Sequence, residues 1–203
     1  MKLQVRISER TFGFFLALWA CLIGLCYYAL IAYSANAGLH NHENDLKFWP
    51  EKSELTRNKG RFTLVTFFHP YCPCSKASLN ELNKIMSRTH HNMDCQIVFL
   101  KPSTNEPDWE KSYLWQLSSQ IPNSTRKTDV NGMLAKSFNA TTSGQTFLYD
   151  PDGKLVFSGG ITSSRGHEGD SQGSIAIENL SAAREAKTSC SQVYGCPLFE
   201  NKI

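Results

Sequence analysis

An uncharged, apolar run from Thr11 to Tyr33 constrains this chain more than any other part of its sequence. A helix over this run is long enough to cross the roughly 30 Å hydrocarbon layer of a membrane. The run is apolar on every face, whereas a helix packed on a soluble core carries a polar stripe. The sequence therefore predicts one membrane-spanning helix over residues 11–33.

Charged residues before this run indicate its orientation. Lys2, Arg6 and Arg10 precede it, together with the single acid Glu9. Basic residues collect on the cytoplasmic side of membrane helices. We therefore expect a single-pass protein of the cytoplasmic membrane, with its N-terminus inside and its remaining residues in the extracytoplasmic compartment.

The end of the apolar run has a second interpretation, because Ala35-Asn36-Ala37 resembles a signal-peptidase site. The run is nevertheless longer than the roughly 7 to 15 residues of a signal-peptide core. We favour an uncleaved anchor over residues 1–35. We expect a linker over 36–58, a domain over 59–188 and a cysteine-containing tail over 189–203.

The composition excludes some partners. The net charge of the 203 residues is only +3, and no basic run interleaves with aromatic residues as a nucleic-acid surface requires. We expect no nucleic-acid partner. Within the polar segment after the anchor, His40 and His42 could bind a metal ion, but the sequence favours a solvated linker there.

A short cysteine motif lies between a predicted strand and a predicted helix. Residues 61–68, RFTLVTFF, form the strand, because they are rich in β-branched and aromatic side chains. The motif HPYCPC follows, with Cys72 and Cys74, and residues 75–86 then place their apolar side chains on one helical face. A second buried strand, residues 96–100, completes a parallel βαβ unit.

The rest of the chain alternates short predicted helices and strands. A Pro-Asp-Gly turn joins two strands into a hairpin. The predicted elements are helix 109–119, strand 126–130, helix 133–138, hairpin strands 146–149 and 154–157, and helix 174–187.

This order of elements, with the segments FTLVTFFHPYCPCSKASLNEL and TSGQTFLYDPDGKLVFSGG, resembles the thioredoxin-like superfamily over about residues 61–187. The resemblance implies an α/β fold, a thioredoxin-like three-layer sandwich with a central mixed sheet, here preceded by one transmembrane helix. It also implies a membrane-anchored redoxin with a CxC motif that exchanges with protein thiols or disulfides and needs no cofactor.

Three features depart from the superfamily pattern. Cys72 and Cys74 are separated by Pro73 alone, where thioredoxins usually have two intervening residues. Gln145 stands before the hairpin strand, where the family usually has a cis-proline facing the cysteines. A long glycine-rich segment, residues 159–173, follows the hairpin.

Cys72 is the predicted nucleophile and Cys74 the predicted resolving thiol. A thiolate is the reactive form of cysteine, and a helix N-terminus lowers a thiol pKa. Pro73 fits the first helical position, so we expect Cys72 at the helix cap. A Cys72–Cys74 disulfide would distort the first turn, which favours an exchange catalyst over a permanent crosslink.

The glycine-rich segment should emerge at the cysteine end of the sheet, because the hairpin runs away from the cysteines and returns. It offers Arg165 or His167 to stabilise the Cys72 thiolate, with Glu168 or Asp170 to orient that cation. A solvated loop whose charges face water remains the alternative.

The other cysteines have structural interpretations. Cys21 and Cys26 lie in the predicted membrane span, and Cys95 begins a buried strand, where a packing role is expected. Cys190 and Cys196 bracket a turn in the tail, where we expect a structural disulfide. Alternatively, one of them resolves a sulfenic acid or mixed disulfide at Cys72.

Three functions fit these residues. The first is an extracytoplasmic thiol:disulfide oxidoreductase that uses Cys72 and Cys74. The alternative is a copper chaperone resembling the Sco family, with Cys72, Cys74 and His167 as Cu(I) ligands, because soft thiolates and an imidazole suit that ion. A peroxidase is the third.

Overall fold

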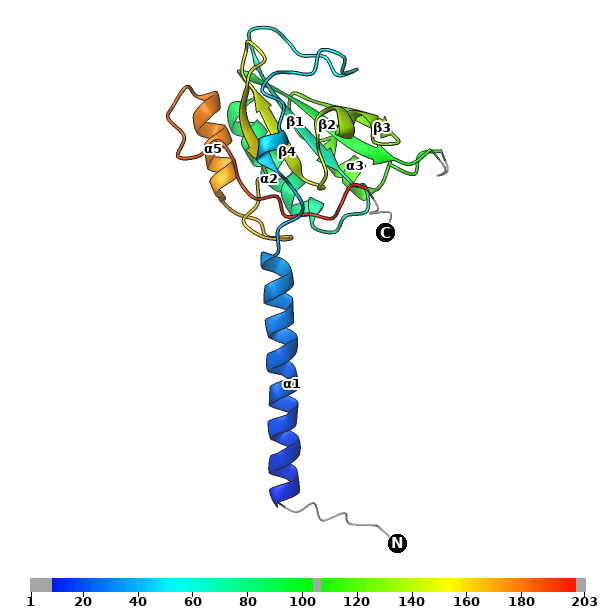
Figure 1. Cartoon of the computed structure of the whole chain (residues 1–203), viewed down its shortest axis with the longest axis vertical. Coiled ribbons are helices and arrows are strands. Elements are labelled where there is room, and N and C mark those ends of the chain that lie inside the picture. Colours follow the sequence, from blue (N-terminus) through cyan, green and yellow to red (C-terminus); the bar gives the residue numbers. More distant parts are fainter. Residues whose placement is uncertain (1–8, 104–106, 200–203) are drawn as a thin grey trace. The chain divides into compact units, whose positions relative to one another are not determined.

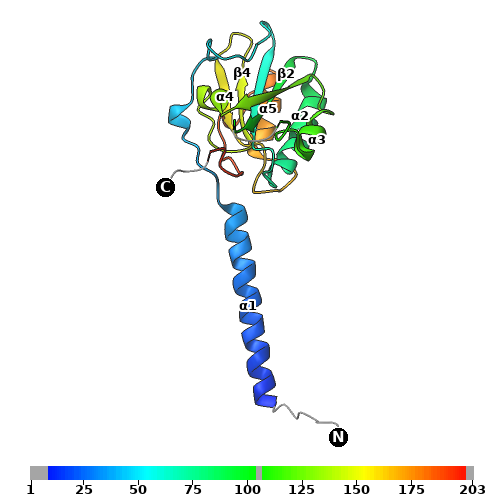
Figure 2. The same cartoon turned by 90° about the vertical axis from the view of Figure 1, so that its right-hand side faces the viewer.

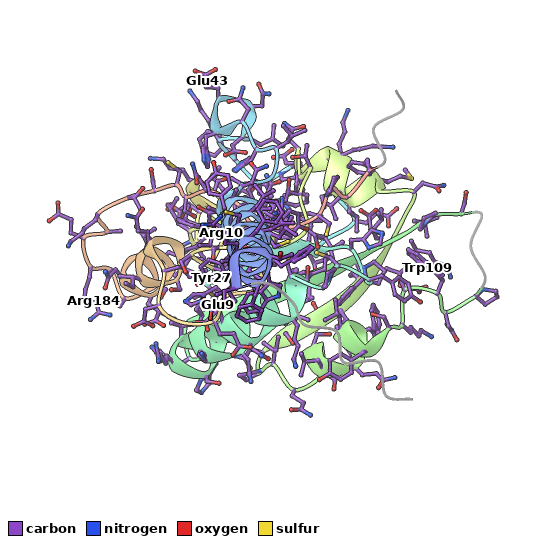
Figure 3. The ribbon with its side chains drawn as sticks, turned by 90° about the horizontal axis from the view of Figure 1, so that it is seen from below. Glu9, Arg10, Tyr27, Glu43, Trp109 and Arg184 are labelled. Carbon is purple, nitrogen blue, oxygen red and sulfur yellow. The ribbon has the colours of Figure 1, made fainter. Side chains whose placement is uncertain are left out.

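The computed structural model describes residues 9–103 and 107–199, which divide between Asn36 and Ala37 into two units. In the first unit, helix α1 covers Glu9–Ala35 and has no buried side chain. Its side chains radiate from the axis in Figure 3, where Glu9, Arg10 and Tyr27 are labelled. Its 27 residues extend about 40 Å. Among the described residues, α1 is the one helix long and apolar enough to span a membrane.

A five-stranded mixed sheet forms the centre of the second unit, in the order β3-β2-β1-β4-β5. Strands β1, Phe62–Phe68, β2, Met93–Lys101, and β3, Ser124–Val130, are mutually parallel. Strands β4, Gln145–Tyr149, and β5, Leu155–Gly159, form an antiparallel hairpin beside β1. The continuous apolar runs of β1 and β2 fit central parallel strands that are covered on both faces.

Two helical layers cover the sheet (Figures 1 and 2). On one face, α2, Ser75–Thr89, packs with α3, Tyr113–Ser118, and α5, Gln172–Ser181, over a core that includes Leu64, Phe99 and Ile177. On the other face, α4, Met133–Ser137, covers a second core around Phe67 and Phe138. The predicted thioredoxin-like three-layer fold is confirmed.

Helix boundaries differ from the prediction where the backbone takes special conformations. Helix α5 ends at Ser181, six residues earlier than predicted, because Ala183 adopts a left-handed φ of 53° and the N–H of Arg184 turns back to the carbonyl of Asn179. Helix α3 begins at Tyr113 because Ser112 is extended and its hydroxyl donates to the carbonyl of Pro70.

The hairpin turn follows the sequence prediction closely. Asp150 Oδ1 accepts hydrogen bonds from the backbone N–H groups of Asp152 and Lys154. Gly153 supplies a left-handed φ of 87° that the turn requires. The turn returns the chain along β4, so that the end of β5 lies beside the start of β4, with Gly159 opposite Thr146.

From Ala37 on, the segment that the sequence predicts to be a linker is part of the second unit and packs into its core. The Trp49 ring lies 5.3 Å from that of Phe138 and 5.1 Å from that of Tyr149, between ring centroids. Leu55 is buried in the same core. The N–H of Gly38 bonds to the carbonyl of Val193 in the C-terminal tail.

Candidate redox site

Cys72 and Cys74 lie in the tight turn between β1 and α2, and both side chains are buried. Helix α2 begins at Ser75, and its N-cap residue is Cys74. The sequence predicted Cys72 as the N-cap residue, but Cys72 lies two residues before the cap. The turn closes through two bonds, from the N–H of Cys72 to the carbonyl of His69 and from the N–H of Ser75 to the carbonyl of Cys72. This turn fixes the Cys72 sulfur at the carboxyl end of β1.

Ser143 ties this turn to the segment that leads into β4. Its Oγ accepts a hydrogen bond from the N–H of His69 at 2.8 Å and shares a second one with Ser75 Oγ, also at 2.8 Å. The Gln145 side chain turns elsewhere, because its Oε1 accepts from the N–H of Thr141 at 2.9 Å. Among the described residues no peptide bond is cis. Ser143, rather than Gln145, therefore faces the cysteine turn.

The C-terminal tail passes directly over Cys72. The N–H of Cys196 points to Cys72 Sγ, with 3.4 Å between nitrogen and sulfur. The tail is held by strand-like pairing, in which the N–H of Ser143 bonds to the carbonyl of Cys196 and the N–H of Leu198 bonds to that of Thr141. A Cβ on Gly195 would lie 1.8 Å from the Ser143 carbonyl oxygen, so only glycine allows this approach.

The expected disulfide between Cys190 and Cys196 is not formed in the structure, where both thiols are free. Cys190 forms an isolated parallel β-bridge with Ser158 on β5. The backbone N–H of Cys196 instead donates to the sulfur of Cys72. The close spacing of the two tail cysteines suggested a local bond. Cys190 pairs with β5, whereas the tail around Cys196 pairs with residues 141–143 before β4.

The three clustered thiols differ in acidity. Burial alone would raise the pKa of Cys72, but hydrogen bonds from the Ser75 side chain and from Cys196 hold it below its ordinary value. Burial and the neighbouring charge of Cys72 raise the pKa of Cys74. Burial and the hydrogen bond to Cys72 raise the pKa of Cys196 to about 12. Cys72 is therefore the thiol that ionises first.

Arg165 is the cation at this site. Its side chain hydrogen-bonds to Cys74 and partly opposes the rise in the pKa of that thiol. Its Nη1 also donates to the carbonyl of Gly195 at 2.6 Å. The predicted return of the loop to the cysteine end is thus found in the structure, with Arg165 beside Cys74 and the tail.

The other loop residues singled out from the sequence lie apart from the thiols. Glu168 accepts a hydrogen bond from Asn80 on α2, and His167 is exposed. Within the described ranges one group of three or more His, Cys, Asp or Glu ligand atoms gathers within 4.8 Å, and it contains neither Cys72 nor His167. The Cu(I) ligand set Cys72, Cys74 and His167 does not fit this arrangement.

Aromatic side chains form the exposed rim of the cysteine turn. The ring of Tyr71, which is 56% exposed, lies 4.9 Å from that of Trp109, and its hydroxyl donates to the Trp109 carbonyl. The His69 ring also lies against Trp109, with centroids 5.7 Å apart. Figure 3 shows Trp109 in the connection between β2 and α3. The rim offers a partner an apolar surface next to Cys72.

Two residues of the site were missed by the sequence analysis, namely Ser75 and Ser143. A serine directly after a cysteine motif is common, so Ser75 carried no distinctive signal. Cys196 was identified as a candidate resolving thiol, but its approach to Cys72 spans 124 residues of sequence. No local pattern predicts such a contact.

No family model matches the sequence, and no curated protein matches it. The structure is similar to a hypothetical protein from Sinorhizobium meliloti, at 17% identity and a TM-score of 0.57 over 69% of this chain and 80% of that one. An uncharacterized conserved protein from Geobacillus kaustophilus aligns at 15% identity and a TM-score of 0.59, over 84% and 96%. A secreted disulfide oxidoreductase of Mycobacterium tuberculosis aligns at 14% identity and 0.44, over 62% and 83%. The first two similarities support the fold alone.

Proposed function

We propose that this protein is a membrane-tethered thiol:disulfide oxidoreductase whose nucleophile is Cys72. The observation that carries the proposal is the lowered pKa of a buried thiol at the end of β1, with two further thiols in contact with it. A lowered pKa supplies the thiolate that attacks a disulfide sulfur. A purely structural cysteine has no need of donors aimed at its sulfur.

The first step is attack of the Cys72 thiolate on one sulfur of a client disulfide. The disulfide bond of the client breaks as the Cys72–client bond forms, and the released client thiolate takes up a proton from solvent. Ser75 and the N–H of Cys196 stabilise the charge on Cys72 before the attack. The aromatic rim of Tyr71 and Trp109 would contact the apolar part of the client chain.

Cys74 carries out the second step. It loses its proton, attacks the Cys72 sulfur and releases the second client thiolate, which is protonated in turn. The client gains two electrons and two protons, and Cys72 and Cys74 lose them. Arg165 assists because its charge favours the Cys74 thiolate, whereas the pKa of Cys196 is raised to about 12. The same steps in reverse oxidise a client dithiol.

The tail with Cys196 must move during exchange, because it covers the Cys72 sulfur. A client disulfide approaches along the line that the Cys196 backbone now occupies beside Ser143. Cys196 can also attack Cys72 itself, which would give a Cys72–Cys196 disulfide. This second internal disulfide would hold the tail closed in the oxidised protein.

The proposed location follows from α1 and the flanking charges. Helix α1 would anchor the chain in the cytoplasmic membrane, with Lys2 and Arg6 on the cytoplasmic side and the thioredoxin-like domain outside. An extracytoplasmic compartment allows protein disulfides to persist, and these are the substrates that the site would exchange.

Trapping with oxidised glutathione tests the proposal on the full-length protein in detergent. The double variant C74S/C196S should accumulate a Cys72–glutathione mixed disulfide, whereas the wild type should release glutathione and form an internal disulfide. The variant C190S is the matched control and should behave as the wild type, because Cys190 lies at β5. Absence of glutathione from Cys72 in the double variant, at equal folding, would refute the nucleophile assignment.

A further inference from the structure

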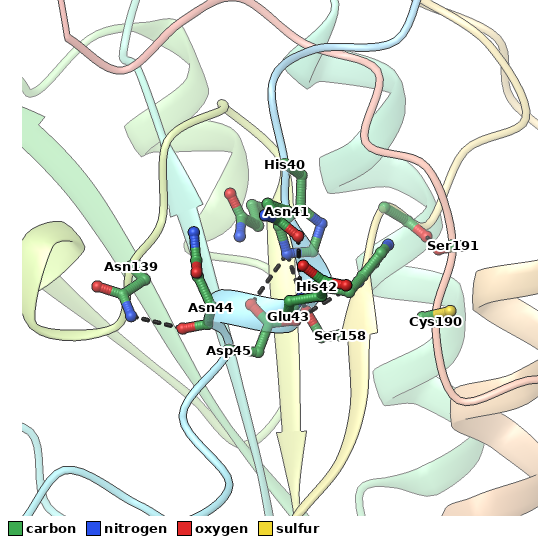
Figure 4. A network of polar contacts seen from close by, with 12 residues as sticks. His40, Asn41, His42, Glu43, Asn44, Asp45, Asn139, Ser158, Cys190 and Ser191 are labelled. Atoms are coloured by element: carbon green, nitrogen blue, oxygen red, sulfur yellow. Dashed lines mark hydrogen bonds and ion pairs between the residues drawn. The ribbon is translucent and has the colours of Figure 1, made fainter.

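Two histidines and an aspartate form a compact cluster in the segment before β1 (Figure 4). His40 Nε2 lies 3.0 Å from Asp45 Oδ1, and His42 Nδ1 lies 3.4 Å from Asp45 Oδ2. One ligand atom from each of the three residues falls within 4.8 Å of the others. The cluster contains none of the thiols of the redox site.

The side chains of this cluster are held in place before any ion arrives. The side chains of His40 and Asp45 are only 4% and 6% exposed, and that of His42 is 36% exposed. A 3₁₀ turn over His42–Asn44 carries the segment, with the Asn41 side chain accepting the N–H of Glu43. The N–H of Asp45 returns to the carbonyl of His42, which fixes the aspartate beneath both rings.

The hydrogen bonds of His40 leave one ring nitrogen unused. Its Nε2 contacts Asp45 and, at 3.2 Å, the hydroxyl of Ser158 on β5. Its Nδ1 and the Nδ1 of His42 are both buried and have no hydrogen-bond partner within the described part of the chain. An unpaired buried polar atom is costly. The two imidazole rings also lie with their centroids only 4.0 Å apart, so that both rings border one small space.

The spacing and chemistry of the cluster indicate the class of ion. The separations of 3.0 Å from His40 Nε2 to Asp45 Oδ1 and of 3.4 Å from His42 Nδ1 to Asp45 Oδ2 lie near the roughly 3.3 Å between neighbouring ligands around a tetrahedral zinc ion with bonds of about 2.0 Å. All three ligand atoms lie within 4.8 Å of one another. Imidazole nitrogens suit Zn²⁺ and its neighbours, whereas Ca²⁺ and Mg²⁺ prefer an all-oxygen set. Three protein ligands leave a fourth position for water.

The open side of the cluster faces a surface pocket. This pocket has a volume of about 460 Å³ and is lined by His42 and Asp45, with Ser158 and Cys190 on its wall. It would give an ion a path from solvent to the cluster. The pocket also joins the N-terminal segment to β5 and to the start of the tail.

We propose that His40, His42 and Asp45 bind a divalent late first-row transition-metal ion, with Zn²⁺ as the representative. The bound ion would hold the segment that follows the anchor in its present conformation, because all three ligands lie within residues 40–45. This proposal is independent of the redox function, because it uses none of the exchanging thiols.

A cobalt titration of the full-length, metal-stripped and reduced protein in detergent tests the site. Co²⁺ reports its ligands by absorption, so a site of nitrogen and oxygen ligands gives ligand-field bands without a sulfur charge-transfer band. The site variants are H42A and D45N. The matched control is the double variant H90A/H91A, which removes an exposed neighbouring histidine pair at the end of α2.

We expect one Co²⁺ per chain in the wild type and in the control, displaced by Zn²⁺, with a rise in melting temperature on binding. Loss of a ligand should weaken binding by at least about 100-fold in H42A and D45N. Equal affinity in wild type, H42A and D45N would overturn the proposal. Binding that carries the sulfur charge-transfer band and persists in both variants would also overturn it, by placing the ion at the thiols.

Discussion

The backbone N–H of Cys196 lies 3.4 Å from the sulfur of Cys72, although 124 residues of sequence separate them. The contact places the C-terminal tail over Cys72 and contributes to lowering the pKa of that thiol. The tail thus couples the acidity of Cys72 to its accessibility. A tail that moves away would expose the sulfur and remove one of its hydrogen bonds at the same time.

The Ser75 side chain is the strongest of the groups that lower the pKa of Cys72. The substitution S75A should therefore raise that pKa and move the midpoint of iodoacetamide alkylation of Cys72 to higher pH. The exposed serine of the same helix supplies the control S87A, which should leave the midpoint unchanged. An identical midpoint in S75A and wild type would show that this hydroxyl does not stabilise the thiolate.

Gly195 sets the fit of the tail against Ser143. The substitution G195A would place a Cβ 1.8 Å from the Ser143 carbonyl oxygen and should displace the tail. Alkylation of Cys72 should then become several-fold faster at a pH where the thiol is ionised in both proteins. The control Q192A changes an exposed tail residue that bonds to Tyr194 and should have no effect. Unchanged alkylation in G195A would mean that the tail does not limit access.

Arg165 should act mainly on the second step of exchange. Its charge favours the Cys74 thiolate, so R165Q should slow the release of glutathione from a Cys72–glutathione mixed disulfide several-fold. Formation of that mixed disulfide should not slow, because Cys72 draws its stabilisation from Ser75 and Cys196. R165K, which keeps the charge, should retain part of the rate. Equal release rates in R165Q and wild type would contradict this role.

Trp49 tests whether the segment before β1 belongs to the folded domain. Its ring packs on Phe138 and Tyr149, so W49A should lower the free energy of unfolding by about 3 kcal/mol. The adjacent Phe48 is 64% exposed, and F48A should cost less than about 1 kcal/mol. Chemical denaturation of both variants provides the comparison. A loss in W49A no larger than in F48A would indicate a detached linker.

Local patterns predicted most of the fold. The apolar runs of β1 and β2 and the Pro-Asp-Gly turn each carry their signal within a few residues, because burial on both faces and turn geometry restrict the residue types there. Boundaries were harder, since the end of α5 depends on the left-handed backbone of Ala183, a residue type that does not mark such positions.

The site was only partly predictable. The position of Arg165 followed from the direction of the hairpin, which is a topological argument. The contact of Cys196 with Cys72 and the burial of His40 depend on how the two ends of the domain pack against the sheet. The sequence predicted a solvated linker around His40. The packing of that segment on β5 instead leaves the His40 side chain only 4% exposed. Such long-range packing leaves no periodic pattern in the chain.

A redox titration of the full-length protein in glutathione buffers, read out by non-reducing peptide mapping, shows directly whether Cys72 forms a reversible internal disulfide. We expect a reversible internal disulfide that always includes Cys72, joined mainly to Cys74, and no internal disulfide in C72S under the same buffers. A Cys72 thiol that stays reduced across the whole titration, or a reversible disulfide that persists unchanged in C72S, would contradict it.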